Sequence, residues 1–199
     1  MLGNDWFVLK NVEFSRHGHA ITDEGNLVPA YVASQLGFSQ SGRKQLDDFY
    51  SRLIKEAKVL PICPFKASGK ILDLSQLGEI TRVNTLERFW DEFNKSVGRV
   101  NYEMLMPISK FMIAILDGGH AVDDGVSAEI GFYASKYQGK RPIIGIRSDF
   151  RLAENISAPI NPALRYFLDQ GPYNGYFFSG ERAYDEAIEA SRNLAKKII

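Results

Sequence analysis

The chain has 199 residues, of which 45% are hydrophobic and 24% charged, as is usual for one globular domain with a sizeable core. Basic and acidic side chains balance at 24 each, which removes the electrostatic argument for a nucleic-acid polymer or a membrane surface as partner. No apolar run reaches the ~20 residues of a membrane helix, the N-terminus does not resemble a signal peptide, and Cys63 is the single cysteine, so we expect a cytoplasmic protein.

Short apolar runs alternate along the chain with segments whose apolar residues recur at helical spacing. Residues 1–27 are expected to form an N-terminal extension with edge strands, and residues 28–199 one α/β domain. Strands are predicted over 27–33, 59–63, 111–116, 142–147 and 176–178, and helices over 40–57, 84–98, 126–138, 161–169 and from a cap at Ser179 to the end. This alternation predicts a flavodoxin-like or Rossmann-like three-layer sandwich with a parallel sheet of about five strands.

Residues 111–131 are the most informative stretch of the chain. They open with six apolar residues, which indicate a strand buried on both faces, and the pattern from Gly125 onward indicates a helix. Four acids follow the strand: Asp117, Asp123, Asp124 and Glu129. Ligands of open α/β sheets bind at this edge, and acids packed there can divide nucleophile and proton-handling roles. Acids at the start of a helix are also common as simple caps.

Three pieces of the chain, in order, resemble the nucleoside 2-deoxyribosyltransferase family over roughly residues 28–178. The first is Y-V-A-S at 31–34, followed by L-G-F at 36–38. The second and most specific is D-D-G-V-S-A-E-I-G at 123–131, which is similar to the family motif D-x-G-(three residues)-E-[LI]-G. The third is P-I-N at 159–161, which is similar to a sugar-binding asparagine segment.

The resemblance implies a role for individual residues. Glu129 matches the catalytic nucleophile, and Asp123 matches an acid that binds the base or sugar and assists with protons. Tyr31 matches a tyrosine that orients the nucleophile, although on a buried strand it could equally be a core aromatic. Further substrate-binding candidates are Asn161, Asp117, Gln35, Leu36, Phe38 and Gly125. Of these, Asp117 could instead cap a loop, and Asn161 could be a turn or cap residue.

Two departures from the family pattern concern the site. Members often carry a further acid before the central strand, where this chain reads N-Y-E-M at 101–104, and no residue there is assigned the role. Members also often end in an aromatic residue that reaches a neighbouring subunit's site, whereas this chain ends K-I-I at 197–199.

The activity that the resemblance implies is transfer of 2-deoxyribose between nucleobases in nucleotide salvage. The N-glycosidic bond would be cleaved through a covalent glycosyl-Glu129 intermediate, with retention, by a homo-oligomer of at least two copies acting on purine or pyrimidine deoxynucleosides and free bases. One alternative is a hydrolase of deoxynucleosides or their 5′-monophosphates, for which Ser34, Ser39, Ser41 and Arg43 could form a phosphate pocket. A second alternative is a non-catalytic nucleotide-binding sensor.

No cofactor or metal is expected. His17 and His19 share one face of a strand, but no cysteine or histidine cluster completes a zinc site with them or with His120. Residues 37–42 lack the Lys-Ser/Thr ending of a P-loop, and no G-x-G-x-x-G follows the first strand.

Overall fold

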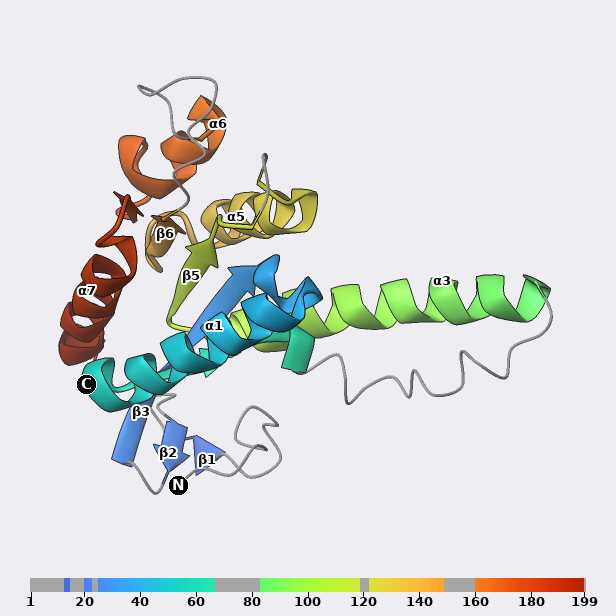
Figure 1. Cartoon of the computed structure of the whole chain (residues 1–199), viewed down its shortest axis with the longest axis horizontal. Coiled ribbons are helices and arrows are strands. Elements are labelled where there is room, and N and C mark those ends of the chain that lie inside the picture. The colour runs from blue at the N-terminus through green and yellow to red at the C-terminus, as the bar shows by residue number, and fades with distance from the viewer. Residues whose placement is uncertain are drawn as a thin grey trace.

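The computed structural model describes residues 13–14, 20–22, 25–66, 83–118, 122–148 and 160–198 (Figure 1). Five parallel strands form its centre: β3 (Gly25–Ser34), β4 (Val59–Ile62), β5 (Phe111–Ile115), β6 (Ile143–Arg147) and β7 (Tyr176–Ser179). Their order across the sheet is β4-β3-β5-β6-β7, which is 2-1-3-4-5 when the parallel strands are numbered along the chain. This is the flavodoxin-like doubly wound order, so the predicted fold class is confirmed.

Two antiparallel strands extend the sheet at the N-terminal end of β3. Strand β1 (Glu13–Phe14) pairs with β2 (Ala20–Thr22), and β2 pairs with residues 25–27 of β3. The predicted core strand at 27–33 therefore begins two residues earlier than expected, because this pairing adds the start of β3 to the ladder.

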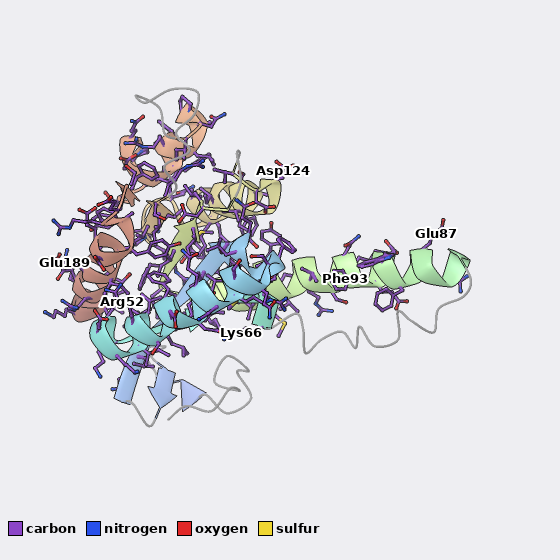
Figure 2. All side chains as sticks on the ribbon, in the orientation of Figure 1. Arg52, Lys66, Glu87, Phe93, Asp124 and Glu189 are labelled. Atoms are coloured by element: carbon purple, nitrogen blue, oxygen red, sulfur yellow. The ribbon has the colours of Figure 1, made fainter. Side chains whose placement is uncertain are left out.

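One long helical segment precedes the central strand β5. Helix α3 (Val83–Arg99) continues without a break as the π-helix η5 (Val100–Leu105) and as α4 (Met106–Ile108). The N-terminal half of α3 extends away from the sheet, and Phe93 is labelled on it in Figure 2. No helix among the described residues is both long enough and apolar enough to cross a membrane.

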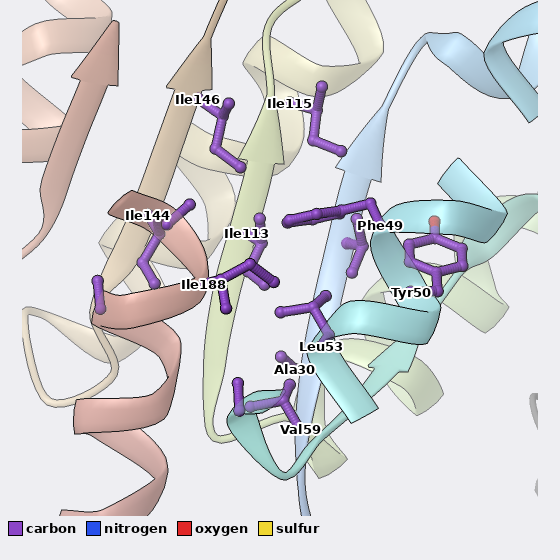
Figure 3. Close-up of a cluster of buried hydrophobic side chains, with 14 of the residues drawn as sticks. Ala30, Phe49, Tyr50, Leu53, Val59, Ile113, Ile115, Ile144, Ile146 and Ile188 are labelled. Atoms are coloured by element: carbon purple, nitrogen blue, oxygen red, sulfur yellow. The ribbon is translucent and has the colours of Figure 1, made fainter. Parts of the chain in front are cut away.

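The face of the sheet covered by α1 (Gln40–Arg52) and α7 (Ala183–Ile198) holds one core cluster. Helix α1 begins after Ser39, whose side chain accepts a hydrogen bond from the Gly42 amide, and it continues as the π-helix η3 (Leu53–Ala57). The apolar stripe of this segment packs with α7 on the sheet, as Figure 3 shows in the side chains of Phe49, Leu53, Ile113, Ile144 and Ile188. The predicted cap at Ser179 is wrong: Ser179 ends β7, and α7 begins four residues later because a turn at Gly180 (φ +91°) intervenes.

The other face of the sheet holds the second core cluster and carries Glu129 and Tyr31. It is covered by α5 (Asp124–Tyr137), by η5 and α4, and by α6 (Pro162–Arg165) with the π-helix η6 (Tyr166–Gln170). Successive side chains of a strand point to opposite faces, so in β3 Val32 packs with α1 and α7 while Tyr31 points toward α5. The start of α5 thus lies beside the carboxyl ends of β3 and β5.

Candidate active site

Three separate elements meet at the carboxylate of Glu129. Glu129 lies on α5 and is only 9% exposed. Tyr31 of β3, 98 residues away in sequence, donates from its hydroxyl to Glu129 Oε1 at 2.6 Å, and Asn101 of η5 donates from Nδ2 to the same atom at 3.2 Å. Both donors contact Oε1. Neither of them donates a hydrogen bond to Oε2.

The environment of Glu129 opposes its ionisation. Burial raises the pKa of Glu129 from an ordinary value of 4.5 to about 7, and the nearby charge of Asp123 acts in the same direction. The hydrogen bonds from Tyr31 and Asn101 lower the pKa of Glu129 but only partly offset the cost of burial. Burial and the adjacent Glu129 charge raise the pKa of Tyr31 well above its usual 10, so Tyr31 remains a neutral phenol that donates. The Glu129 carboxyl group therefore changes charge near neutral pH.

Asp123 stands at the N-terminus of the helix that carries Glu129. It is the N-cap of α5, and its Oδ1 accepts a hydrogen bond from the Val126 amide at 3.0 Å. Gly125 leaves room for this carboxylate, since a Cβ at Gly125 would stand 2.9 Å from Asp123 Oδ1. Helix α5 thus supplies both acids. The hydrogen bond to the Val126 amide positions Asp123, while Glu129 is buried further along the helix.

A cavity of about 650 Å³ adjoins these groups. Glu129, Asp123 and Asn101 form part of its wall together with Gly125. Aromatic and apolar side chains make much of the remaining wall: Phe38, Phe65, Phe93, Val97, Leu46 and Tyr50. A pocket of this size, largely apolar with a few convergent polar groups, suits a small organic ligand that carries polar substituents.

Phe38 is the predicted base-binding residue that borders this cavity. It ends the short 3₁₀-helix η2 (Leu36–Phe38), is 74% exposed and packs edge-on against Phe65, with ring centroids 4.8 Å apart. Gly37 allows this contact, because a Cβ there would overlap the Phe65 ring. An exposed aromatic face beside a cavity is a suitable surface for stacking a flat ring.

Asp117, Gln35 and Leu36 lie outside the cavity wall. Asp117 is buried and accepts hydrogen bonds from the amide and hydroxyl of Ser148, at 2.7 Å each, and from the Tyr184 hydroxyl at 3.0 Å. Gln35 donates from Nε2 to the Asp117 carbonyl at 2.9 Å, and Leu36 is buried beside it. The structure therefore joins the Asp117 and Gln35 side chains to the ends of β5 and β6 rather than to Glu129.

Asn161 is likewise placed away from the cavity wall. It is the N-cap of α6, and its Oδ1 accepts from the Ala163 amide at 2.8 Å. Residues 149–159, which include Asp149, lie outside the described residues, as do His17, His19 and His120. Within the described ranges, no group of three or more His, Cys, Asp or Glu side chains could hold a metal ion.

Several cavity residues were not singled out by the sequence. Asn101 lies in the segment where the resembled family carries an acid, which was the one signal that pointed to it. Lys66 contributes a cation that pairs with Asp47, and Phe65 and Phe93 contribute aromatic wall; no sequence signal identified them. Of the residues predicted for a phosphate pocket, Ser34 and Arg43 border the cavity, while the Ser39 hydroxyl caps α1.

The chain is similar to known proteins at the level of solved structures. No family model and no curated protein matches the chain. A 2-deoxyribosyltransferase from Leishmania mexicana has a similar structure, with a TM-score of 0.45 and 20% sequence identity over 81% of this chain and 97% of that chain. Both values are low, so this likeness carries no argument about function.

Proposed function

We propose that the chain is a transferase that moves 2-deoxyribose between nucleobases by cleaving an N-glycosidic bond, an activity suited to nucleotide salvage. The observation that carries this proposal is the Glu129 carboxylate at the cavity wall, with Oε1 held by Tyr31 at 2.6 Å and Oε2 left for attack. The motif at 123–131, which resembles that of nucleoside 2-deoxyribosyltransferases, supports the same reading.

In the proposed reaction, Glu129 Oε2 attacks the anomeric carbon from the face opposite the base. The carbon–nitrogen bond breaks, its electron pair goes to the base nitrogen, and Asp123 supplies the proton with which the base leaves. The sugar is then an ester of Glu129, and a second base attacks the same carbon, displaces the carboxylate and passes its N–H proton to Asp123. Two inversions retain the configuration, as in retaining glycosidases. Tyr31 stabilises the carboxylate each time it carries charge.

The cavity wall supports a nucleoside as the ligand of this site. Phe38 offers an exposed ring face for a purine or pyrimidine, while Asp123 and Glu129 lie on the wall that would face the sugar and the scissile bond. The contacts of Asp117 favour a role in holding the ends of β5 and β6 together over direct substrate binding. Asn161 remains a proposed sugar ligand from the resemblance alone.

We propose a homo-oligomer in which α3 meets a second copy. Three aromatic side chains, Phe89, Trp90 and Phe93, lie against one another on this extended helix, and Trp90 is 41% exposed. Phe93 also borders the cavity, so a second copy seated here would cover the site. Trp90 is exposed and Phe89 and Phe93 are partly exposed, so together they would form the apolar centre of an interface, and most of the roughly 800 Å² per partner of a standard interface would come from other residues.

A hydrolase acting on 5′-monophosphates is a second candidate because two cations border the same cavity. Arg43 lies in the first turn of α1, and Lys66 pairs with Asp47, which is one turn further along the same face of that helix. Either could bind a phosphate group. A sensor that binds nucleosides without turnover is less well supported, since binding alone needs no buried carboxylate beside a second acid.

The test is to incubate the protein with a 2′-deoxynucleoside and a different free base, and to separate the products by chromatography. A new nucleoside in the wild type and none in Glu129→Gln is the expected result, with a sugar adduct on Glu129 found by mass spectrometry. Release of free deoxyribose regardless of added base would favour the hydrolase. Binding without any product would favour the sensor, and undiminished transfer by Glu129→Gln would refute the assignment of the nucleophile.

A further inference from the structure

The Asn101 amide nitrogen has a hydrogen-bond partner, whereas its amide oxygen has none among the described residues. Asn101 is 7% exposed and lies in the π-helix η5, a kind of segment that often marks functional positions. Its Nδ2 donates to Glu129 Oε1 at 3.2 Å. Its Oδ1 is buried and, among the described residues, has no hydrogen-bond partner. Because Asn101 borders the cavity, a ligand there can offer the missing donor.

The position of this oxygen limits which donor of a ligand can reach it. Oδ1 belongs to the same planar amide whose Nδ2 contacts Glu129 Oε1, so it lies near the carboxylate group that is proposed to attack the anomeric carbon. In a β-nucleoside the base is on one face of the sugar, and the 2′- and 3′-hydroxyl groups of ribose are on the other, the face that Glu129 approaches. The 2′-hydroxyl is on the carbon bonded to the anomeric carbon, so it is the nearest donor.

We infer that Asn101 determines specificity at the 2′-position: its Oδ1 accepts a hydrogen bond from a 2′-hydroxyl, so the chain accepts ribonucleosides as well as 2′-deoxyribonucleosides. This inference rests on the proposed function. A carboxylate at position 101 would also accept this bond, but it would repel Glu129 instead of donating to it. The amide serves both neighbours, with its nitrogen toward the nucleophile and its oxygen toward the sugar.

The experiment compares kcat/KM for a ribonucleoside, its 2′-deoxy form and its 3′-deoxy form, using the base that the wild type releases fastest. Asn101→Leu removes both polar ends at similar volume. Loss of one hydrogen bond to substrate is expected to lower the ratio of ribonucleoside to 2′-deoxynucleoside activity by about 3- to 10-fold. Asn101→Asp keeps an acceptor and should retain the wild-type ratio, while its lost donor and added charge slow both substrates and move their pH profiles upward.

Val97→Ala is the matched control. Val97 borders the cavity one helical turn before Asn101 and carries no polar atom, so this change should leave the ratio unaltered. Asn101→Ala replaces the leucine variant if thermal unfolding shows that the latter does not fold.

Three results would overturn the inference. The first is a wild type that cleaves 2′-deoxynucleosides but no ribonucleoside. The second is a leucine variant whose kcat/KM falls equally for all three substrates. The third is a leucine variant whose kcat/KM falls selectively for substrates with a 3′-hydroxyl. A wild type inactive on every nucleoside is a different result, because it refutes the proposed function itself.

Discussion

Replacing the buried carboxylate of Glu129 by an amide should make the protein more stable at alkaline pH. Glu129 has a pKa of about 7 in the folded chain against 4.5 ordinarily, with burial as the largest cause. A pKa difference of one corresponds to about 1.4 kcal/mol, so ionising Glu129 costs the folded state about 3 kcal/mol more than the unfolded state. The folded state binds the proton more tightly, so stability is fully present below pH 4.5 and falls as the pH rises through about 7. Glu129→Gln keeps an oxygen that accepts from Tyr31 and Asn101 and avoids this cost.

Urea unfolding at pH 4 and pH 8.5 measures the effect. The glutamine variant should match the wild type at the acidic pH and exceed it by up to about 3 kcal/mol at the alkaline pH, because only there is the wild-type carboxyl ionised. Asp124→Asn is the control: Asp124 is an exposed acid on the same helix, labelled in Figure 2, and its removal should bring no such gain. A glutamine variant no more stable than the wild type at pH 8.5 would refute the claim that burial dominates the electrostatics of this carboxyl group.

Three further changes test the site and its surroundings. Tyr31→Phe removes a 2.6 Å hydrogen bond that lowers the pKa of Glu129. We expect kcat to fall about tenfold and the rising limb of the pH–rate profile to move about one pH unit higher. A rising limb at the wild-type pH would count against this contact. Gly125→Ala places a Cβ 2.9 Å from Asp123 Oδ1, so we expect about a tenfold loss of kcat with little change in thermal stability, whereas full activity would show that the Asp123 position is not critical. Trp90→Ser should yield a folded monomer in sedimentation equilibrium where the wild type sediments as an oligomer; an unchanged oligomer would place the interface elsewhere.

The fold was largely predictable because buried parallel strands have a plain sequence pattern. The apolar runs over β5 and β6 place each strand within one residue of its observed ends, since both faces of these strands are covered. The segment before β5 was less predictable. The helix was predicted to end near Gly98, with a second segment leading to Ser109. The two form one continuous helical segment to Ile108, because Val100, Leu105 and Met106 pack into the core and outweigh the local cost of glycine.

The site was predictable only where its residues lie close together in sequence. Asp123 and Glu129 share one helix, so their spacing in the motif already fixes their arrangement. Asn101 shows no such signal, since its contact with Glu129 depends on how the π-helix η5 packs against α5 across 28 residues. Asparagine is also common on protein surfaces, so the residue type alone does not mark position 101 as part of a site. Only the folded chain shows that this amide faces the carboxylate.

Two substitutions of Asp123 separate its role as a helix cap from its proposed role as a proton donor. Its Oδ1 caps α5 at 3.0 Å from the Val126 amide, and its proposed chemical role is to supply the proton with which the base leaves. Asp123→Ala removes both functions and should cost about 1 kcal/mol of stability as well as activity. Asp123→Asn keeps a capping oxygen and removes the exchangeable carboxyl proton, so it should unfold at the wild-type urea concentration yet lose about 100-fold in kcat. The loss should be smallest for nucleosides whose base leaves readily without a proton. If the asparagine variant transfers every base at the wild-type rate, Asp123 is only a helix cap, and the proton must come from another group.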